Sequence, residues 1–90
     1  MMMHNPASPG ELLREFIGDY PVSKLAEHIG VTRATVSRIL NGRTSVTVDL
    51  SIRLGQALSL SPEFFSKAQL QFDLWSAMKK QRPKIKPLAA

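Results

Sequence analysis

Residues 23–42 read SKLAEHIGVTRATVSRILNG, two short amphipathic segments separated by a glycine. Ser23 is a suitable N-cap for the first segment, and Gly30 favours the left-handed backbone conformation that ends many helices. Thr32 can cap the second segment in the same way. The inward-facing side chains of the first segment are Leu25, Ala26 and Ile29. Two short helices joined at a tight glycine turn are typical of a helix-turn-helix unit.

The second segment is predicted to be a helix from Arg33 to Leu40 that buries Val36 and Ile39 and is closed by Asn41-Gly42. Arginine can bond both acceptors of guanine, hydroxyl groups suit several bases, and small methyl groups contact thymine, so its outer face suits the DNA major groove. The base-facing candidates are Arg33, Ala34, Thr35, Ser37 and Arg38. The flanking residues expected to meet phosphate are Ser23, Lys24, Asn41, Arg43 and Thr44.

The periodicity alone leaves a second interpretation open. Helical hairpins with a glycine turn occur in many proteins that do not bind DNA. An arginine on an exposed helix face is commonly only a solvated charge. The residue pattern by itself therefore fits a DNA reader and an ordinary helical hairpin alike.

Two further helices frame the hairpin. The sequence Ser8-Pro9-Gly10-Glu11 indicates a capping box and a helix from about Pro9 to Asp19, ended by Pro21. Its apolar face is Leu12, Leu13, Phe16 and Ile17. Thr47 is expected to cap a helix from about Val48 to Leu58, in which Gly55 allows close packing. The buried stripe of that helix is Leu50, Leu54, Ala57 and Leu58.

The last predicted helix opens at Ser61-Pro62-Glu63, ends near Met78 and has two apolar faces. One face is Phe64, Phe65, Ala68, Phe72 and Trp75. The other is Leu70, Leu74 and Met78, which repeat every four residues. One face can dock on the core, and the second is either additional core or the seam of a homodimer.

Length and charge set the domain organisation. Ninety residues with 43% hydrophobic side chains predict one small all-α domain over residues 9–78, preceded by an arm at 1–8. Residues 79–90 read as a basic, flexible tail with five positive charges and no acidic residue. The net charge of +5 favours an anionic partner, either a nucleic acid or an anionic membrane. Residues 21–53 carry a local net charge of +3.

Several function classes lack the residues they need. The longest runs without charged residues are too short for a membrane span, so we expect a cytoplasmic protein with no membrane partner. There is no cysteine, and the two histidines, His4 and His28, stand apart from any set of metal ligands or catalytic partners. Glu11 and Glu15 are one helical turn apart, as on a solvated face. We expect no enzyme activity, no cofactor and no metal.

From Pro6 to about Trp75 the chain resembles the HigA-type antitoxins, also called the virulence-associated protein I family, within the lambda-repressor-like (XRE) helix-turn-helix group. The matching stretches are PASPGELL at 6–13, LAEHIGVT at 25–32, VSRILNGR at 36–43, ALSLSPEFF at 57–65 and LQFDL at 70–74. Family members often have tyrosine where Phe72 stands, and the tail after Met78 matches no motif of the family.

The resemblance implies a five-helix domain that dimerises, binds a palindromic operator and represses its own operon. It also implies a second partner, a RelE-like ribonuclease toxin that the antitoxin neutralises. Positions 33, 34, 35, 37 and 38 correspond to base-facing places, and 41, 43 and 44 to backbone-contacting places. The acidic candidates for toxin contact are Glu11, Glu15 and Asp19. A free-standing XRE-family regulator without a toxin is the alternative.

Overall fold

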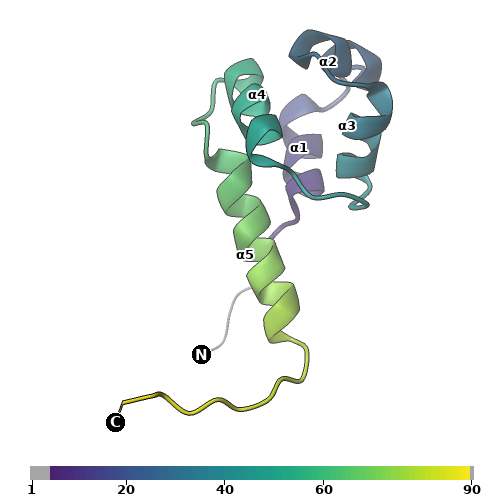
Figure 1. Cartoon of the computed structure of the whole chain (residues 1–90). Helices are drawn as coiled ribbons and strands as arrows, with labels where there is room; N and C mark the ends of the chain where they lie inside the picture. The colour runs from purple at the N-terminus through teal and green to yellow at the C-terminus, as the bar shows by residue number, and fades with distance from the viewer. Residues whose placement is uncertain (1–4, 90) are drawn as a thin grey trace.

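The protein is described from a computed structural model over residues 5–89, and within that range its regular secondary structure consists of five α-helices. The helices are α1 (Pro9–Ile17), α2 (Val22–Ile29), α3 (Arg33–Leu40), α4 (Val48–Leu58) and α5 (Phe64–Met78). Helices α1 to α4 form a compact head, and α5 starts beneath α4 and runs away from it (Figure 1). This all-α, lambda-repressor-like arrangement confirms the predicted fold. Part of the predicted N-terminal arm, residues 1–4, lies outside the described residues.

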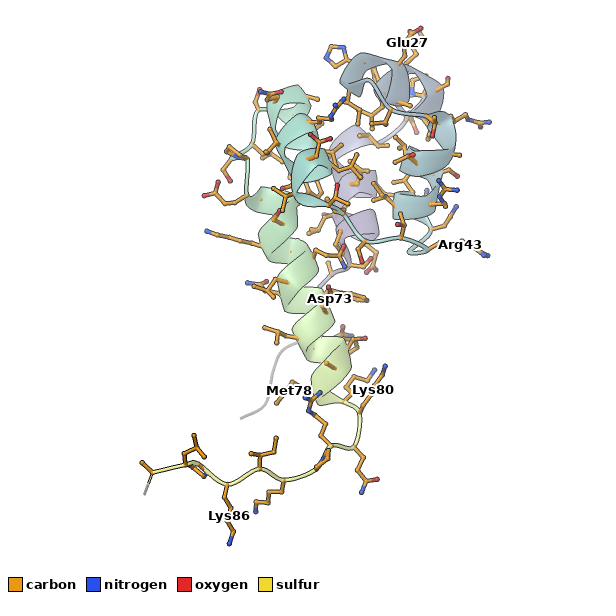
Figure 2. The ribbon with its side chains drawn as sticks, viewed as in Figure 1. Glu27, Arg43, Asp73, Met78, Lys80 and Lys86 are labelled. Atoms are coloured by element: carbon orange, nitrogen blue, oxygen red, sulfur yellow. The ribbon has the colours of Figure 1, made fainter. Side chains whose placement is uncertain are left out.

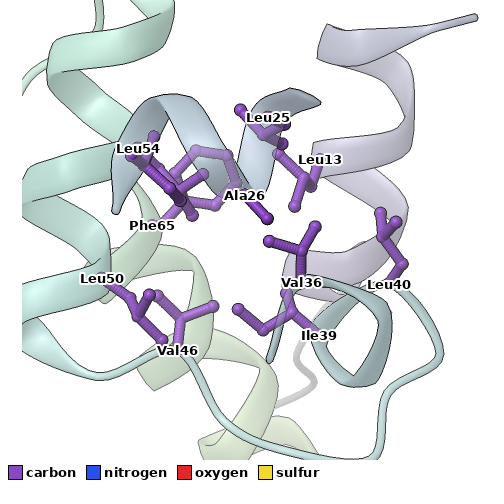
Figure 3. Packing of buried hydrophobic residues seen from close by; sticks show 11 residues of the cluster. Leu13, Leu25, Ala26, Val36, Ile39, Leu40, Val46, Leu50, Leu54 and Phe65 are labelled. Carbon is purple, nitrogen blue, oxygen red and sulfur yellow. The ribbon is translucent and has the colours of Figure 1, made fainter. Parts of the chain in front are cut away.

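The core lies where the four head helices meet the first turn of α5 (Figure 3). Leu13, Leu54 and Phe65 are completely buried there. The stripes predicted for α2 and α3 are confirmed, because each of their inward-facing residues is buried. The remaining core residues are Leu25, Ala26, Ile29, Val36, Ile39, Leu40, Val46 and Leu50. The outward faces of α2 and α3 are therefore fixed by how their inner faces pack.

Three of the predicted helix starts have the expected caps. The Ser8 hydroxyl accepts the Glu11 amide N–H, and the Glu11 carboxylate accepts the Ser8 amide N–H at 2.8 Å, which completes a capping box. These bonds from the Ser8 backbone and side chain lower the pKa of Glu11. Thr32 caps α3 and Thr47 caps α4 through their side-chain oxygens.

Two predicted boundaries are wrong. Helix α1 ends at Ile17, before Asp19, because Gly18 takes a positive φ of 52° and its N–H bonds the Arg14 carbonyl. Ser23 is not the N-cap of α2, because the extended backbone of Pro21 starts the helix two residues earlier. Ser23 therefore lies within the first turn of α2.

Helix α5 is capped from another helix. The sequence predicts a start at Ser61-Pro62-Glu63, but its N-cap residue Glu63 makes no side-chain capping bond. The buried Ser51 hydroxyl of α4 donates to the Pro62 carbonyl at 2.6 Å and accepts the Ser66 amide N–H at 2.9 Å. Gly55 permits the close approach, since a Cβ there would lie 2.7 Å from the Ser61 carbonyl oxygen.

Beyond its first turn, α5 leaves the core. The described chain is 53 Å long and about 20 Å across, and its radius of gyration of 15.7 Å exceeds the roughly 12 Å of a compact chain of this length. Residues 81–89 follow without helix or strand and are fully exposed. No helix in the described range is long and apolar enough to cross a bilayer.

Candidate nucleic-acid interface

Helix α3 holds the predicted base-facing set on a firmly packed support. Val36 and Ile39 are 1% and 2% exposed, which anchors the inner side of the helix in the core. On the opposite side, Arg33, Ala34 and Arg38 are exposed. Thr35 and Ser37 are half-buried at the edges of this face. The structure therefore brings all five predicted residues to one outward side of one helix.

The start of α3 already uses one of these hydroxyl groups. Thr35 Oγ1 lies 2.9 Å from Thr32 Oγ1, while the Thr35 amide N–H donates to the same Thr32 oxygen. The Thr35 hydroxyl is therefore shared with the helix cap. Its methyl group stays available for an apolar contact.

The end of α3 carries a hydrogen-bonded chain that sequence reasoning missed. Arg14 of α1 donates from Nη2 to the Asn41 Oδ1 at 3.2 Å. The Asn41 amide lies 3.5 Å from the Ser37 Oγ, at the long limit for a hydrogen bond. Arg14 and Asn41 are 27 positions apart in the sequence, so no local pattern could have paired them. The guanidinium thus adds a positive charge beside the predicted backbone-contacting residue.

The remaining predicted phosphate contacts flank α3 on both sides. Arg43 and Thr44 are exposed in the loop after α3, which Gly42 turns with a φ of 68°. Arg43 points outward from the head (Figure 2). Ser23 and Lys24 are exposed in the first turn of α2, whose N-cap is a proline without a side-chain acceptor. Amide groups at such a helix start favour anions.

Not every basic residue in the helix-turn-helix region is free for DNA. Arg53 Nε pairs with Asp49 at 2.8 Å, and its Nη1 donates to the Ile29 carbonyl at 2.7 Å. It thereby caps the end of α2 and joins it to α4. The local positive charge therefore comes from Lys24, Arg33, Arg38 and Arg43.

The predicted dimer seam is exposed in the single chain. Leu70, Leu74 and Met78 are 59%, 47% and 59% exposed along the projecting part of α5. The opposite face begins with buried Phe65 and half-buried Phe64 and continues to Phe72 and Trp75, whose rings are 6.0 Å apart. The Lys79 ammonium lies 4.0 Å from the Trp75 ring centroid. Leu70, Leu74 and Met78 are therefore not part of this chain's core.

The residues considered for other chemistry lie apart. His28 is exposed on α2, and no group of three metal-binding side chains occurs within residues 5–89. His4 falls outside the described range. Of the acidic candidates for toxin contact, Glu11 is engaged in the capping box and Asp19 lies beyond the end of α1. Glu11, Glu15 and Asp19 therefore do not form one helical stripe.

Comparison with known proteins identifies the family to which this chain is similar. The family model described as Helix-turn-helix matches residues 13–65, from the first core leucine to the buried start of α5. The chain is 37% identical over 89 residues to antitoxin HigA-1 of Vibrio cholerae, and the match covers 92% of this chain and 84% of that protein.

Two solved structures extend the likeness to three dimensions. The addiction module antidote protein of the HigA family from Coxiella burnetii has a TM-score of 0.81 and 34% identity, covering 84% of this chain and 86% of that one. The Pseudomonas aeruginosa antitoxin HigA, solved with the higBA promoter, has a TM-score of 0.78 and 32% identity, covering 82% and 84%. The family model, the sequence identity and the two solved structures together show that this chain belongs to the helix-turn-helix family and, within it, to the HigA-type antitoxins.

Proposed function

We propose that this protein is a DNA-binding antitoxin that represses its own operon. The observation that carries the proposal is α3, a helix with one side buried in the core and the other offering two arginines, the Ser37 hydroxyl and the Thr35 methyl group. The similar Pseudomonas antitoxin was solved with promoter DNA, which supports the same use of the fold here. The protein acts by binding in the cytoplasm, where operator DNA is found, and not as an enzyme.

In this proposal, α3 reads base edges in the major groove. Arg33 and Arg38 bond guanine, which is the commonest specific contact of arginine with DNA. Ala34 and the Thr35 methyl group contact thymine methyl groups. Ser37 contributes a hydroxyl at the far end of the helix, next to Asn41. These five side chains supply the sequence preference.

Phosphate contacts hold α3 in register. Lys24 and Arg43 supply charge, and Ser23, Asn41 and Thr44 supply neutral polar groups. They come from the start of α2 and the loop after α3, so they bracket the recognition helix from two sides. The tail at 79–90 adds attraction that does not depend on base sequence.

The proposed mode of recognition includes a homodimer. One helix covers a few base pairs, while a two-fold pair of α3 helices can reach half-sites about 34 Å apart, one turn of DNA. Leu70, Leu74 and Met78 form the seam, because an exposed apolar row on a projecting helix is stabilised when a second copy covers it. The operator is then a palindrome.

The second partner in the proposal is a RelE-like, mRNA-cleaving toxin. The similarity to named antitoxins supports a toxin partner in general, and the RelE-like type follows from the family resemblance. The antitoxin neutralises the toxin by forming a complex with it.

Two measurements test the proposal. Fluorescence anisotropy should show the protein binding DNA from upstream of its own gene at least about 1000-fold more tightly than a shuffled duplex, within the usual range of specificity ratios. Co-expression with the product of the adjacent reading frame should yield a co-purifying complex. Specific DNA binding without any toxin complex would leave the free-standing regulator as the function. Failure of both would overturn the proposal.

A further inference from the structure

A groove of about 310 Å³ opens between the end of α1, α2 and the end of α4. Its walls are mainly apolar and include Phe16, Tyr20, Leu25 and Leu58. Phe16 and Tyr20 remain 44% and 50% exposed. The volume is at the lower limit of small-molecule pockets and suits one or two inserted side chains of a protein. Helix α3 contributes no residue to this groove.

The aromatic wall of the groove is held in place by the core. The Phe16 ring packs edge-on against Phe64 at 5.5 Å and Phe65 at 6.2 Å between centroids. The Tyr20 amide N–H donates to the Ile17 carbonyl at 2.8 Å, which fixes the turn that presents the tyrosine. A preformed aromatic site binds with little ordering cost, and buried aromatic anchors dominate many protein interfaces.

Exposed acidic residues are direct sequence neighbours of the groove's lining residues, although the lining itself contains no acid. Glu15 and Asp19 adjoin Phe16 and Tyr20 in the sequence, Glu27 adjoins the lining residue His28, and all three acids are exposed. Among residues 15–21, 24–29 and 56–59, Lys24 is the one basic residue besides His28. Glu27 lies on the far side of the head from the tail (Figure 2). The nearest exposed sequence neighbours of the groove's lining residues are thus mostly acidic, in contrast to the positive α3 face.

The acidic residues near the groove limit which protein can bind there. A second copy of the chain docked groove to groove would bring Glu15, Asp19 and Glu27 against their own counterparts, and like charges in contact oppose binding. The chain's own basic tail begins at the opposite end of α5 and runs away from the head (Figure 1). A separate basic protein fits both the charge and the apolar floor.

We propose that this groove docks the toxin, a basic protein that inserts an aromatic or aliphatic side chain between Phe16 and Leu58 and places lysine or arginine against Glu15, Asp19 and Glu27. This inference rests on the proposed antitoxin function and assigns a surface to it. Of the acidic residues predicted from the sequence for toxin contact, Glu15 and Asp19 are kept. Glu11 is left out because it is engaged in the capping box, and Glu27 is added. Because α3 is not involved, the protein can hold operator and toxin together.

The test uses the full chain and a catalytically inactive form of the toxin encoded beside it. Tyr20→Ala is the apolar variant, because the half-exposed Tyr20 side chain is not part of the buried core. The triple variant Glu15→Lys, Asp19→Lys and Glu27→Lys reverses the charge. Val48→Ala and Asp73→Lys are matched controls, an exposed apolar and an exposed acidic residue outside the groove. Operator affinity of every variant checks that the head is folded.

Calorimetry should show toxin affinity lowered at least about tenfold by Tyr20→Ala and at least about 100-fold by the triple variant at low salt. The controls should stay within about twofold of the unmodified chain in toxin affinity. No variant should bind the operator more weakly than the unmodified chain, and the triple variant, which gains positive charge, should bind DNA more tightly at low salt. If the unmodified chain binds the toxin and both groove variants bind it equally well, the groove is not the docking site. If the unmodified chain does not bind the toxin, the antitoxin function itself is wrong.

Discussion

Helices α3 and α5 both carry an exposed row of side chains, but the two rows differ in chemistry and support. The α3 row is polar and basic and lies on an eight-residue helix whose other side is buried. The α5 row is apolar and lies on a fifteen-residue helix of which only Phe65 is fully buried. DNA presents hydrogen-bonding edges and phosphates, whereas an exposed apolar row needs another protein surface.

The difference between the two rows suggests separate roles in DNA binding, base reading for α3 and dimerisation for α5. In the proposed function, the buried inner side of α3 fixes where its arginines point, and the α5 seam sets how far apart two α3 helices lie. Specific binding to a palindrome needs both. Variants that affect one helix and spare the other therefore separate dimerisation from base reading.

The largest effect is expected from Leu74→Asp. A carboxylate in the apolar seam loses its water without a partner, so the dimer should dissociate. Operator affinity should fall by about 3 kcal/mol or more, because the two half-sites are no longer bound together. Sedimentation velocity should report a monomer, and far-UV circular dichroism should show unchanged helical content. Leu88→Asp, a control on the exposed tail, should leave the dimer intact, and a Leu74→Asp dimer would place the seam elsewhere.

The next largest effect should come from Arg33→Ala and Arg38→Ala. Each removes a base-facing guanidinium and should weaken specific binding by about 1 to 3 kcal/mol while the protein stays folded and dimeric. Anisotropy titrations against operator and shuffled DNA measure the change. Lys67→Ala, an exposed basic residue on α5, is the matched control. Unchanged discrimination in both arginine variants would remove them from the readout.

Ser51→Ala tests how α5 is attached to the head. The change leaves the Pro62 carbonyl and the Ser66 amide without their buried partner, so unfolding free energy should fall by about 1 to 3 kcal/mol. Thr47→Ala, which removes the exposed cap of α4, should cost about 1 kcal/mol. Urea denaturation measures both values. Equal stability of Ser51→Ala and the unmodified chain would show that the Ser51 hydroxyl does not hold the helix start.

The smallest effect on base reading should come from removing the tail after Met78. Five positive charges are lost, so the affinity for non-specific DNA should fall. The slope of log affinity against log salt concentration should become shallower by at most about 4.5. The ratio of operator to shuffled-DNA affinity should stay nearly the same. Titrations at several salt concentrations measure both quantities. An unchanged slope would show that the tail does not contact DNA.

Local signals were sufficient for α3. Thr32 supplies a cap, Val36 and Ile39 set the inner face, and Asn41-Gly42 closes the helix, so its boundaries follow from neighbouring residues alone. The same reasoning failed at Ser23, because Pro21 competes for the cap position and starts α2 earlier.

Contacts between distant residues were beyond local reasoning. Ser51 is eleven positions from Pro62, and Arg14 is 27 from Asn41. Arg53 reads as a free charge in the sequence but is paired with Asp49 and the end of α2. The residue pattern gave the candidate recognition face and seam, and the family resemblance supported both. Neither indicated the groove, because it forms only when α1, α2 and α4 are packed.

Hydroxyl-radical footprinting of the DNA upstream of this gene tests the claim that two copies of α3 read one palindrome. We predict two protected patches on one face of the duplex, related by a two-fold axis and about one helical turn apart, and symmetric loss of both with Arg38→Ala. A single protected patch, or protection that Arg38→Ala leaves unchanged, would contradict the claim.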